Sequence, residues 1–419
     1  MKVFKSSLIA LALTCASSVY AQSIAITNAT VHTVTEQGVL TNATVVIDNG
    51  VITAINPESV TADSIIDAMG KILTPGLIGS MNTLGLVEVS AVSRTRDGGD
   101  KKADITFDAS TAFNSKSAAI AYSRKGGITT NVVTPSGGES MFKGQAFVAD
   151  LSGELDSIVE TNSAVIVDIG SKSRGSRALT LQKLHNKFED AQKALAKAKQ
   201  KLAESKKDKD KKKEAKDLKR DEKVINALLA GEKPLIAYAD RATDILALLK
   251  LKQDFNLDLV IVDAGDAVRV APQLAEANVP VIIGTIDNLP SFDALHQSLN
   301  SASILMDAGV TVAFKVNGDT HNLYQLRFDA GVAVANGVSK DQALAAVTAN
   351  VADAFNFDAG RIAVGKKADL VLWSADPFEL STHVEKMWID GVERSTQSRH
   401  DALRKRYTTQ SDMPRAYTK

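Results

Sequence analysis

Cysteine and histidine are scarce in this sequence, with one Cys and six His among 419 residues. A single Cys excludes a disulfide scaffold and any zinc or iron–sulfur site built on several thiolates. Six His also limit the metal centres that imidazole ligands could form. The 49 basic and 49 acidic side chains cancel, which argues against a dedicated nucleic-acid binder and predicts no nucleic-acid partner. With 44% hydrophobic residues, the chain can bury a sizeable core, so global disorder is excluded.

The first 21 residues have the features of a cleavable signal peptide. Lys2 and Lys5 form a charged start, Leu8 to Leu13 form a short apolar core, and a small residue, Ala21, ends the segment. We therefore expect cleavage after Ala21 and a periplasmic or secreted protein. The only cysteine, Cys15, lies inside this segment, so we expect no disulfide in the mature protein. No later stretch reaches the ~18 apolar residues that a transmembrane helix requires.

Two β-rich segments flank a different central region. Residues 22–75 alternate apolar and polar side chains and contain Asn49-Gly50, a hairpin signal. Alternation returns in residues 360–395, where Trp373 and Trp388 are expected to belong to the core of a β-sandwich. We predict that the two segments pair into one small β-sandwich, a discontinuous composite domain. Residues 396–419 are then a C-terminal tail.

Short apolar runs alternate with amphipathic stretches across residues 76–359. The runs include Gly127 to Val133, Leu235 to Ala239, Leu257 to Val262 and Val310 to Val316. Strands buried on both faces and separated by helices indicate an α/β fold with a parallel sheet. We predict a (β/α)₈ TIM-like barrel over 76–359. An open doubly wound sheet is the alternative, but no Gly-rich phosphate loop follows the first strand.

A highly charged insertion interrupts this region at residues 178–232. Lys183 to Lys223 contains 16 basic and 9 acidic residues, a local charge of 16 − 9 = +7. Apolar residues from Leu181 to Leu202 recur at alternating spacings of three and four, which predicts a helix with a heptad seam. We expect a helical hairpin with its tip at Lys206 to Lys213. It is either a solvated insertion or a docking arm for a partner subunit or an anionic surface.

Motifs at both ends of the chain resemble one enzyme family. "ATVHTVTEQGVLTNATVVIDNGVITAI" and "IIDAMGKILTPGLIG" are similar to the N-terminal half-sandwich of the amidohydrolase superfamily. "AVTANVADAF" and "GRIAVGKKADLVLWSADPFE" are similar to its C-terminal return, and the likeness is closest to imidazolonepropionase-like amidohydrolases. The resemblance implies a barrel that hydrolyses non-peptide C–N bonds, often in cyclic amides. It also implies strand-end imidazoles that hold a divalent metal, and an Asp on the last strand that moves a proton.

The expected metal-ligand positions carry other residues in this chain. The His-x-His positions of the first strand hold Met81 and Thr83, and the fifth- and sixth-strand His positions hold Asp240 and Asp263. A thioether cannot replace imidazole for Zn²⁺ at a hydrolytic site. We therefore expect no cofactor, and we assign Met81, Thr83, Asp240 and Asp263 to a substrate pocket rather than to a metal centre.

A substituted site is the alternative. Asp240, Asp263 and Asp319 would supply oxygen ligands that suit Mg²⁺, Mn²⁺ or Ca²⁺. The competing interpretation is that these carboxylates accept bonds from local backbone amides or pair with Arg241 and Lys315.

The last barrel strand offers one further polar set. Asn317 occupies the straightforward Asp alignment, Asp319 fits after a two-residue shift, and His321 is the one His near a strand end. Asp319 and His321 are the candidate catalytic residues. Gly137 to Ser140 and Lys143 to Gln145 resemble a substrate-facing loop at the barrel mouth, although a glycine-containing turn with solvated polar residues is the favoured interpretation.

Two functional hypotheses follow, and they belong to different classes. The first is a non-catalytic partner of a competent paralogue, bound as a homologous subunit in a hetero- or homo-oligomer through the Lys-rich hairpin. The second is an active C–N hydrolase with a carboxylate-rich metal site. A ligand-binding module that kept the barrel pocket is a third.

Overall fold

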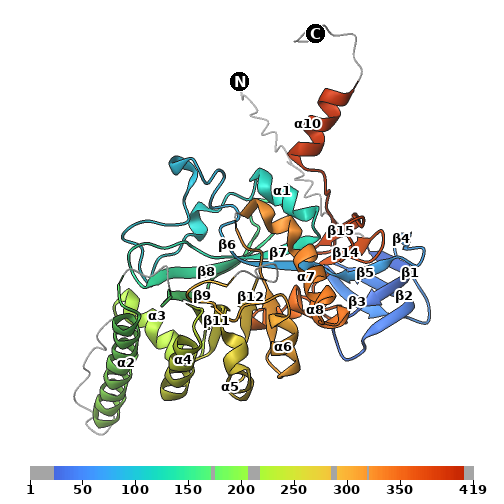
Figure 1. Cartoon of the computed structure of the whole chain (residues 1–419). Coiled ribbons are helices and arrows are strands. Elements are labelled where there is room, and N and C mark those ends of the chain that lie inside the picture. Colours follow the sequence, from blue (N-terminus) through green and yellow to red (C-terminus); the bar gives the residue numbers. More distant parts are fainter. Residues whose placement is uncertain (1–22, 171–174, 206–217, 285–289, 319, 410–419) are drawn as a thin grey trace, which may run out of the picture.

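The computed structural model describes residues 23–170, 175–205, 218–284, 290–318 and 320–409. These residues form two sheets of eight strands each, and helices cover one face of the second sheet (Figure 1). The expected signal peptide and the expected hairpin tip at Lys206 to Lys213 lie outside the described residues. In the described ranges, no helix has both the length and the apolar character to cross a membrane.

The first sheet is built from both ends of the chain. Its strand order is β16-β15-β14-β5-β1-β2-β3, and β4 also pairs with β1. The junction is the antiparallel pair β5–β14, in which Pro75 faces Leu370 and Ile72 faces Trp373. The bounds of its strands are β1 (Ile24–His32), β2 (Val39–Asp48), β3 (Val51–Ile55), β4 (Ser64–Asp67), β5 (Ile72–Pro75), β14 (Leu370–Trp373), β15 (Val384–Ile389) and β16 (Val392–Glu393).

Local sequence explains how this sheet forms. Asn49 and Gly50 both have positive φ, 49° and 79°, as the tight β2–β3 turn requires. Trp388 is fully buried in the apolar core of the sheet. Trp373 differs from the prediction, because it packs in the cluster shared with the second sheet, where its indole N–H donates to Thr74 Oγ1 at 2.9 Å. It therefore fastens the two sheets together.

The second sheet is curled and lies between the two halves of the first in sequence. Its strand order is β13-β12-β11-β10-β9-β8-β7-β6. Among the described residues, no ladder joins β6 to β13, and the helix α9 (Ala349–Ala354) packs in the core cluster on the concave face. The strand bounds are β6 (Leu77–Asn82), β7 (Ile128–Val133), β8 (Phe142–Asp150), β9 (Ile158–Asp168), β10 (Leu235–Ala239), β11 (Leu259–Asp263), β12 (Val281–Ile283) and β13 (Val312–Phe314).

One strand departs from the all-parallel barrel that the sequence predicts. β8 runs antiparallel to both β7 and β9, and it contains Lys143 to Gln145, which were expected to form a loop. A parallel neighbour needs a crossover of a dozen or more residues. Only residues 134–141 and 151–157 separate these strands, so hairpin-like returns are the geometry that fits.

Most of the helices lie between consecutive strands of the second sheet along the chain. Their bounds are α1 (Ala118–Arg124), α2 (Arg177–Ser205), α3 (Arg220–Leu229), α4 (Ala242–Phe255), α5 (Ala271–Glu276), α6 (Ser301–Asp307), α7 (Leu326–Ala335), α8 (Lys340–Ala346), α9 and α10 (Arg399–Thr408). Four short 3₁₀ segments are η1 (Ser93–Thr95), η2 (Ser110–Ala112), η3 (Ala267–Val270) and η4 (Thr320–Gln325).

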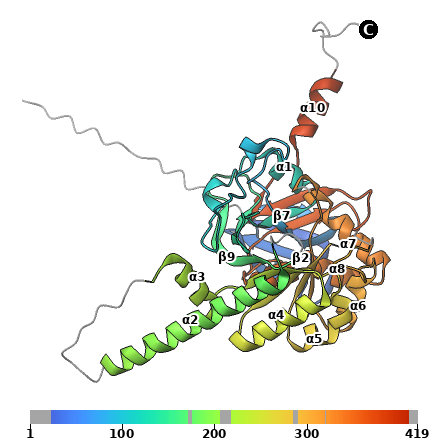
Figure 2. The same ribbon diagram turned by 60° about the vertical axis from the view of Figure 1, so that its left-hand side comes forward.

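The charged insertion contains two helices, α2 and α3. Near its start, α2 buries Leu184 and Phe188 in the main core, together with Ile225 and Leu228 of α3. Phe188 also contacts Phe255 of α4, with 5.6 Å between ring centroids. Farther along, α2 projects from the body (Figure 2). The first part of α2 thus packs on the body, and its second part projects from it. The domain limits drawn from the sequence remain predictions.

Candidate ligand pocket

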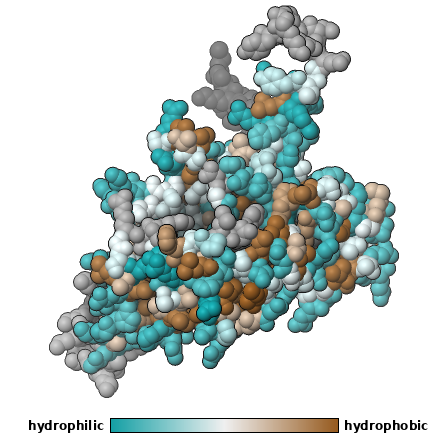
Figure 3. Space-filling model, in the orientation of Figure 1, coloured by the Kyte–Doolittle hydropathy of each residue, from teal (hydrophilic) through white to brown (hydrophobic). Residues whose placement is uncertain are grey.

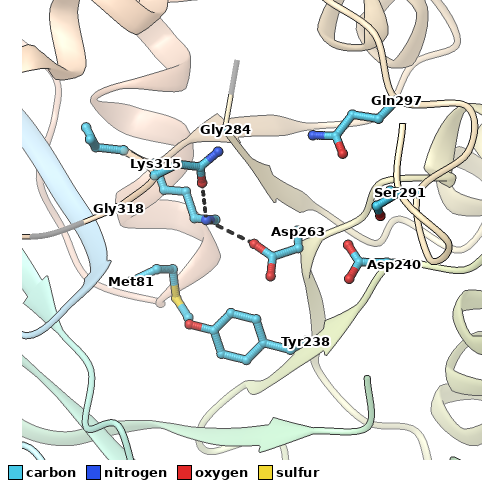
Figure 4. A pocket seen from close by; sticks show the side chains of 12 residues that line it. Met81, Tyr238, Asp240, Asp263, Gly284, Ser291, Gln297, Lys315 and Gly318 are labelled. Atoms are coloured by element: carbon cyan, nitrogen blue, oxygen red, sulfur yellow. Dashed lines mark hydrogen bonds and ion pairs between the residues drawn. The ribbon is translucent and has the colours of Figure 1, made fainter. Parts of the chain in front are cut away.

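A polar cavity of about 460 Å³ opens at the carboxyl ends of β10 to β13. This end of a curled parallel sheet is where strand-end side chains converge and where barrel proteins place their sites. Figure 4 shows the lining side chains pointing toward one another. The lining residues are Met81, Tyr238, Asp240, Asp263, Gly284, Ser291, Ala294, Gln297, Lys315, Val316, Asn317 and Gly318.

An ion pair lies at the centre of the pocket. Lys315 Nζ lies 2.9 Å from Asp263 Oδ1 and donates to Asn317 Oδ1 at 2.6 Å. Asp263 ends β11, and Lys315 directly follows β13. The Lys315 side chain is 11% exposed and that of Asp263 is 25% exposed. The ammonium group is therefore held in place by the chain's own carboxylate and amide oxygens.

Asp240 lines the same pocket from the end of β10. Its Oδ1 accepts a long hydrogen bond, 3.4 Å, from the Gly265 backbone N–H. With Asp263 and Lys315, it gives the pocket a formal charge of −1. The interpretation of Asp240 as a backbone acceptor and of Asp263 as a partner of Lys315 therefore describes the contacts in the structure.

Backbone strain collects at the strand ends around the pocket. Met81, Asp263 and Ala264 have φ values of 57°, 71° and 53°. Residues other than glycine rarely adopt this left-handed conformation, which costs roughly 1–2 kcal/mol each. Gly284 gives room for the neighbouring amide, since a Cβ there would lie 2.2 Å from Asn317 Nδ2. Such strain is typical of positions that aim side chains into a site.

Tyr238 contributes a neutral hydroxyl to the pocket. Burial raises its pKa well above the ordinary value, and the negative charges of Asp263 and Asp168 raise it further. The phenol therefore keeps its proton at neutral pH. Asp168 itself is the last residue of β9 and is buried. Sequence reasoning did not single it out, although it ends a buried apolar run just as Asp263 does.

The rim of the pocket is held by a network of charges. Asp293 pairs with Arg241 and with Arg177, each at 2.7 Å. Arg177, the first residue of α2, also lies 3.2 Å from Asp244 of α4. Burial raises the pKa of Asp244 more than the two arginines lower it. The rim segment that contains Ser291 is thus tied to the root of the charged hairpin.

The structure separates the remaining predicted site residues. Thr83 is not among the lining residues, and its hydroxyl shares a 3.1 Å hydrogen bond with Thr320. His321 lies in η4 with an exposed side chain and does not line the pocket. Asp319 lies outside the described residues, so the Asp319–His321 pair remains a prediction.

Comparison with known proteins identifies the family. Residues 149–394 match the model of the amidohydrolase family, and the chain belongs to that family. It is 22% identical over 389 residues to amidohydrolase tasK of Hapsidospora irregularis, an alignment that covers 83% of this chain and 39% of that protein. The chain thus spans well under half of its curated relative.

Solved structures agree on the fold. An amidohydrolase from Thermotoga maritima MSB8 superposes with a TM-score of 0.76 at 26% identity, over 88% of this chain and 99% of that one. A β-aspartyl dipeptidase from Fervidobacterium islandicum AW-1 superposes with a TM-score of 0.54 at 13% identity, over 88% and 96%. These neighbours confirm a mixed α/β, TIM-like barrel fold, with the antiparallel β8 as its correction.

Amidohydrolases usually bind a divalent metal, and the pocket residues allow a test of whether this chain offers suitable ligands. Met81 supplies a thioether, and Asp263 already faces the Lys315 ammonium. Throughout the described ranges, no group of three or more His, Cys, Asp or Glu side chains is arranged to hold a metal ion. The side chains that line the pocket therefore do not fit the metal centre that the family resemblance implies.

Proposed function

We propose that this chain is a non-catalytic member of the amidohydrolase family that acts beside a catalytically competent paralogue. One observation carries the proposal, which is that the Lys315 ammonium pairs with Asp263 at 2.9 Å inside the pocket. Charges of +1 and +2 at 4 Å repel by about 8 kcal/mol at an effective dielectric constant of ~20. Lys315 therefore offsets the attraction that one of the two pocket carboxylates, Asp263, would exert on a divalent ion, which leaves Asp240 as the source of the net charge of the lining residues.

The pocket geometry also supports a binding role for the barrel. Neutral Tyr238 and the side chains of Gln297, Ser291 and Asn317 offer hydrogen bonds around the ion pair (Figure 4). Such a lining can orient a small polar ligand without activating water. The proposal includes export, supported by the charged and apolar pattern of residues 1–21, and a homologous partner subunit held through the projecting hairpin.

Metal analysis of the purified protein tests the proposal. After growth with Mg²⁺, Mn²⁺, Ca²⁺ and Zn²⁺, mass spectrometry should find far less than one divalent ion per chain. Assays on cyclic amides and dipeptides should show no turnover by the chain alone. A stoichiometric ion that is lost in Asp240→Ala and Asp263→Ala, but retained in the exposed control Asp307→Ala, would overturn the proposal.

The second candidate is an active C–N hydrolase with a substituted metal site. It is favoured by the position of Asp240 and Asp263, which both line the same cavity. In that case the stoichiometric ion and amide turnover would disappear together in the two pocket variants. The same experiment thus decides between the two candidates.

A further inference from the structure

The lining of the pocket carries more negative than positive charge. Asp240 and Asp263 supply two carboxylates, and of the lining residues that the structure describes, Lys315 alone is cationic. Ala239, the residue before Asp240, pairs with Asp263 in the β10–β11 ladder, so the two carboxylates stand at neighbouring strand ends (Figure 4). A ligand that complements this charge is a cation.

The ammonium group in the lining is largely enclosed. The Lys315 side chain is 11% exposed, less than the 25% of Asp263. Its Nζ is held by Asp263 Oδ1 and by Asn317 Oδ1. An anionic ligand would have to displace these oxygens to reach the ammonium group, whereas a cationic ligand meets a carboxylate that is more open to the cavity.

Two arginines lie at the rim of the pocket but outside its lining. Arg241 follows Asp240 in sequence, yet its Nε and Nη2 both lie 2.7 Å from Asp293 Oδ1. Arg177 lies 2.7 Å from the other carboxylate oxygen of Asp293 and 3.2 Å from Asp244. The charges of both arginines are thus paired with rim carboxylates rather than with the carboxylates of the cavity.

Neutral hydrogen-bonding groups complete the cavity. Ser291 and Gln297 line it from the rim, and Asn317 lies just beyond β13. Burial raises the pKa of the Tyr238 phenol, and the negative charge of Asp263 raises it further, so the phenol stays neutral in the field of the carboxylates. The volume of about 460 Å³ is typical of a site for a small molecule.

We infer that the pocket binds a small organic cation, whose ammonium or guanidinium head donates hydrogen bonds to Asp240 and Asp263. The inference rests on the binding role in the proposed function and names the chemical class of the ligand. Both heads combine a positive charge with several N–H donors, and charge-assisted hydrogen bonds to carboxylates are stronger than neutral ones. Lys315 holds the Asp263 carboxylate in place for this contact.

Calorimetric titration of the full chain, in a buffer of low salt that contains EDTA, tests the inference. Four probes share a butyl chain and differ in their heads: butylammonium, butylguanidinium, neutral butanol and anionic pentanoate. At least one cation should bind about tenfold more tightly than butanol, and pentanoate should bind no more tightly than butanol. Hydrophobic side chains also gather in patches on the outer surface (Figure 3), and butanol measures how much the butyl chain binds there. The tighter of the two cations identifies the head.

Two pocket variants and one control locate the contact. Asp240→Asn should weaken binding of the tighter cation by about tenfold, because it removes a charge and keeps the size of the side chain. Gln297→Glu adds a carboxylate to the lining and should tighten binding by about threefold; a variant that failed to fold could not produce this gain. Asp307→Asn is the matched control, since Asp307 is exposed and outside the lining, and its affinity should stay within about twofold.

Several results would overturn the inference. They are pentanoate binding as tight as that of either cation, no cation binding above the butanol level, or an affinity that either pocket variant leaves unchanged. EDTA removes divalent ions from every sample, and no hydrolysis is measured. Failure of the inference is therefore distinct from failure of the proposed function, which metal content and turnover decide.

Discussion

Ionisation of Asp369 is expected to make the stability of the protein depend on pH, because this residue is buried in the sheet that joins the two ends of the chain. It lies just before β14, its side chain is 10% exposed, and its Oδ1 accepts a 2.7 Å hydrogen bond from the Asp390 backbone N–H. Burial raises the pKa of Asp369 from 3.8 to about 6, although Lys367, 4.0 Å away, opposes the shift. The change Asp369→Asn removes the charge and can keep the accepted hydrogen bond.

The sign follows from the raised pKa. Between pH 4 and pH 6 the folded protein holds a proton that the unfolded chain releases, so stability falls as pH rises through this window. With folded and unfolded pKa values of about 6 and 3.8, Asp369 lowers the free energy of unfolding, relative to a side chain that stays neutral, by about 1.6 kcal/mol at pH 5 and about 3 kcal/mol at pH 8. Asp369→Asn should recover these amounts.

Urea unfolding followed by tryptophan fluorescence measures this effect. Trp388 is buried in the same sheet and reports its unfolding directly. Asp390→Asn is the matched control, because Asp390 lies 3.9 Å from the same Lys367 but its side chain is 63% exposed. Its effect should stay within about 0.5 kcal/mol at both pH values. A variant Asp369→Asn that is no more stable than the parent at pH 8, or whose gain is the same at pH 5, would refute the reasoning.

Two further changes test the pocket, and a third tests how α7 is held to the C-terminal segment. Lys315→Met should lower the free energy of unfolding by about 3 kcal/mol, because it leaves the Asp263 carboxylate without its cation. Adding Asp263→Asn should recover about 2 kcal/mol in a double-mutant cycle measured by urea unfolding. Strictly additive effects of the two changes would contradict the ion pair. Arg327→Leu should lower the free energy of unfolding by roughly 3 kcal/mol in the same assay, because the buried guanidinium donates hydrogen bonds to three backbone carbonyls. A decrease below about 1 kcal/mol would contradict this role. Gly265→Ala should destabilise the protein by about 1–3 kcal/mol and change the shape of the pocket rim, because the new Cβ would lie 2.3 Å from the Cβ of Ala294. An unchanged melting temperature would argue against this crowding.

Much of the fold could be predicted from local sequence. The apolar run Leu235 to Ala239 is β10 residue for residue, and Asn49-Gly50 forms the turn between β2 and β3. These features depend on side-chain alternation and turn chemistry within a few residues. β8 was missed because Lys143, Gly144 and Gln145 interrupt its apolar pattern, and only the short connections on both sides require its antiparallel direction.

The centre of the pocket depends on contacts that local sequence does not encode. Asp263 and Lys315 are 52 residues apart and end strands that are separated by β12, so the ion pair follows from strand order. Asp293 meets Arg177 across 116 residues, and it holds the rim to a helix that looked like an independent insertion. The family resemblance predicted that Asp240 and Asp263 would line a pocket, but it left open whether they would bind a metal ion or pair with Arg241 and Lys315. The structure pairs Asp263 with Lys315.

The β5–β14 pairing has a consequence for how the protein is made. Pro75 and Leu370 are neighbours in the sheet but are 295 residues apart in sequence. At ~5–20 residues per second, a ribosome needs roughly 15–60 s to synthesise the second strand after the first. During that interval the edge of β5 has no partner strand from the C-terminal segment. The second sheet, which lies between β5 and β14 in sequence, must form before the β5–β14 pairing exists. Trp373, which carries the contact between the sheets, is therefore among the last core residues to arrive, so truncated or stalled chains would expose an unpaired strand edge where the finished protein has a continuous sheet.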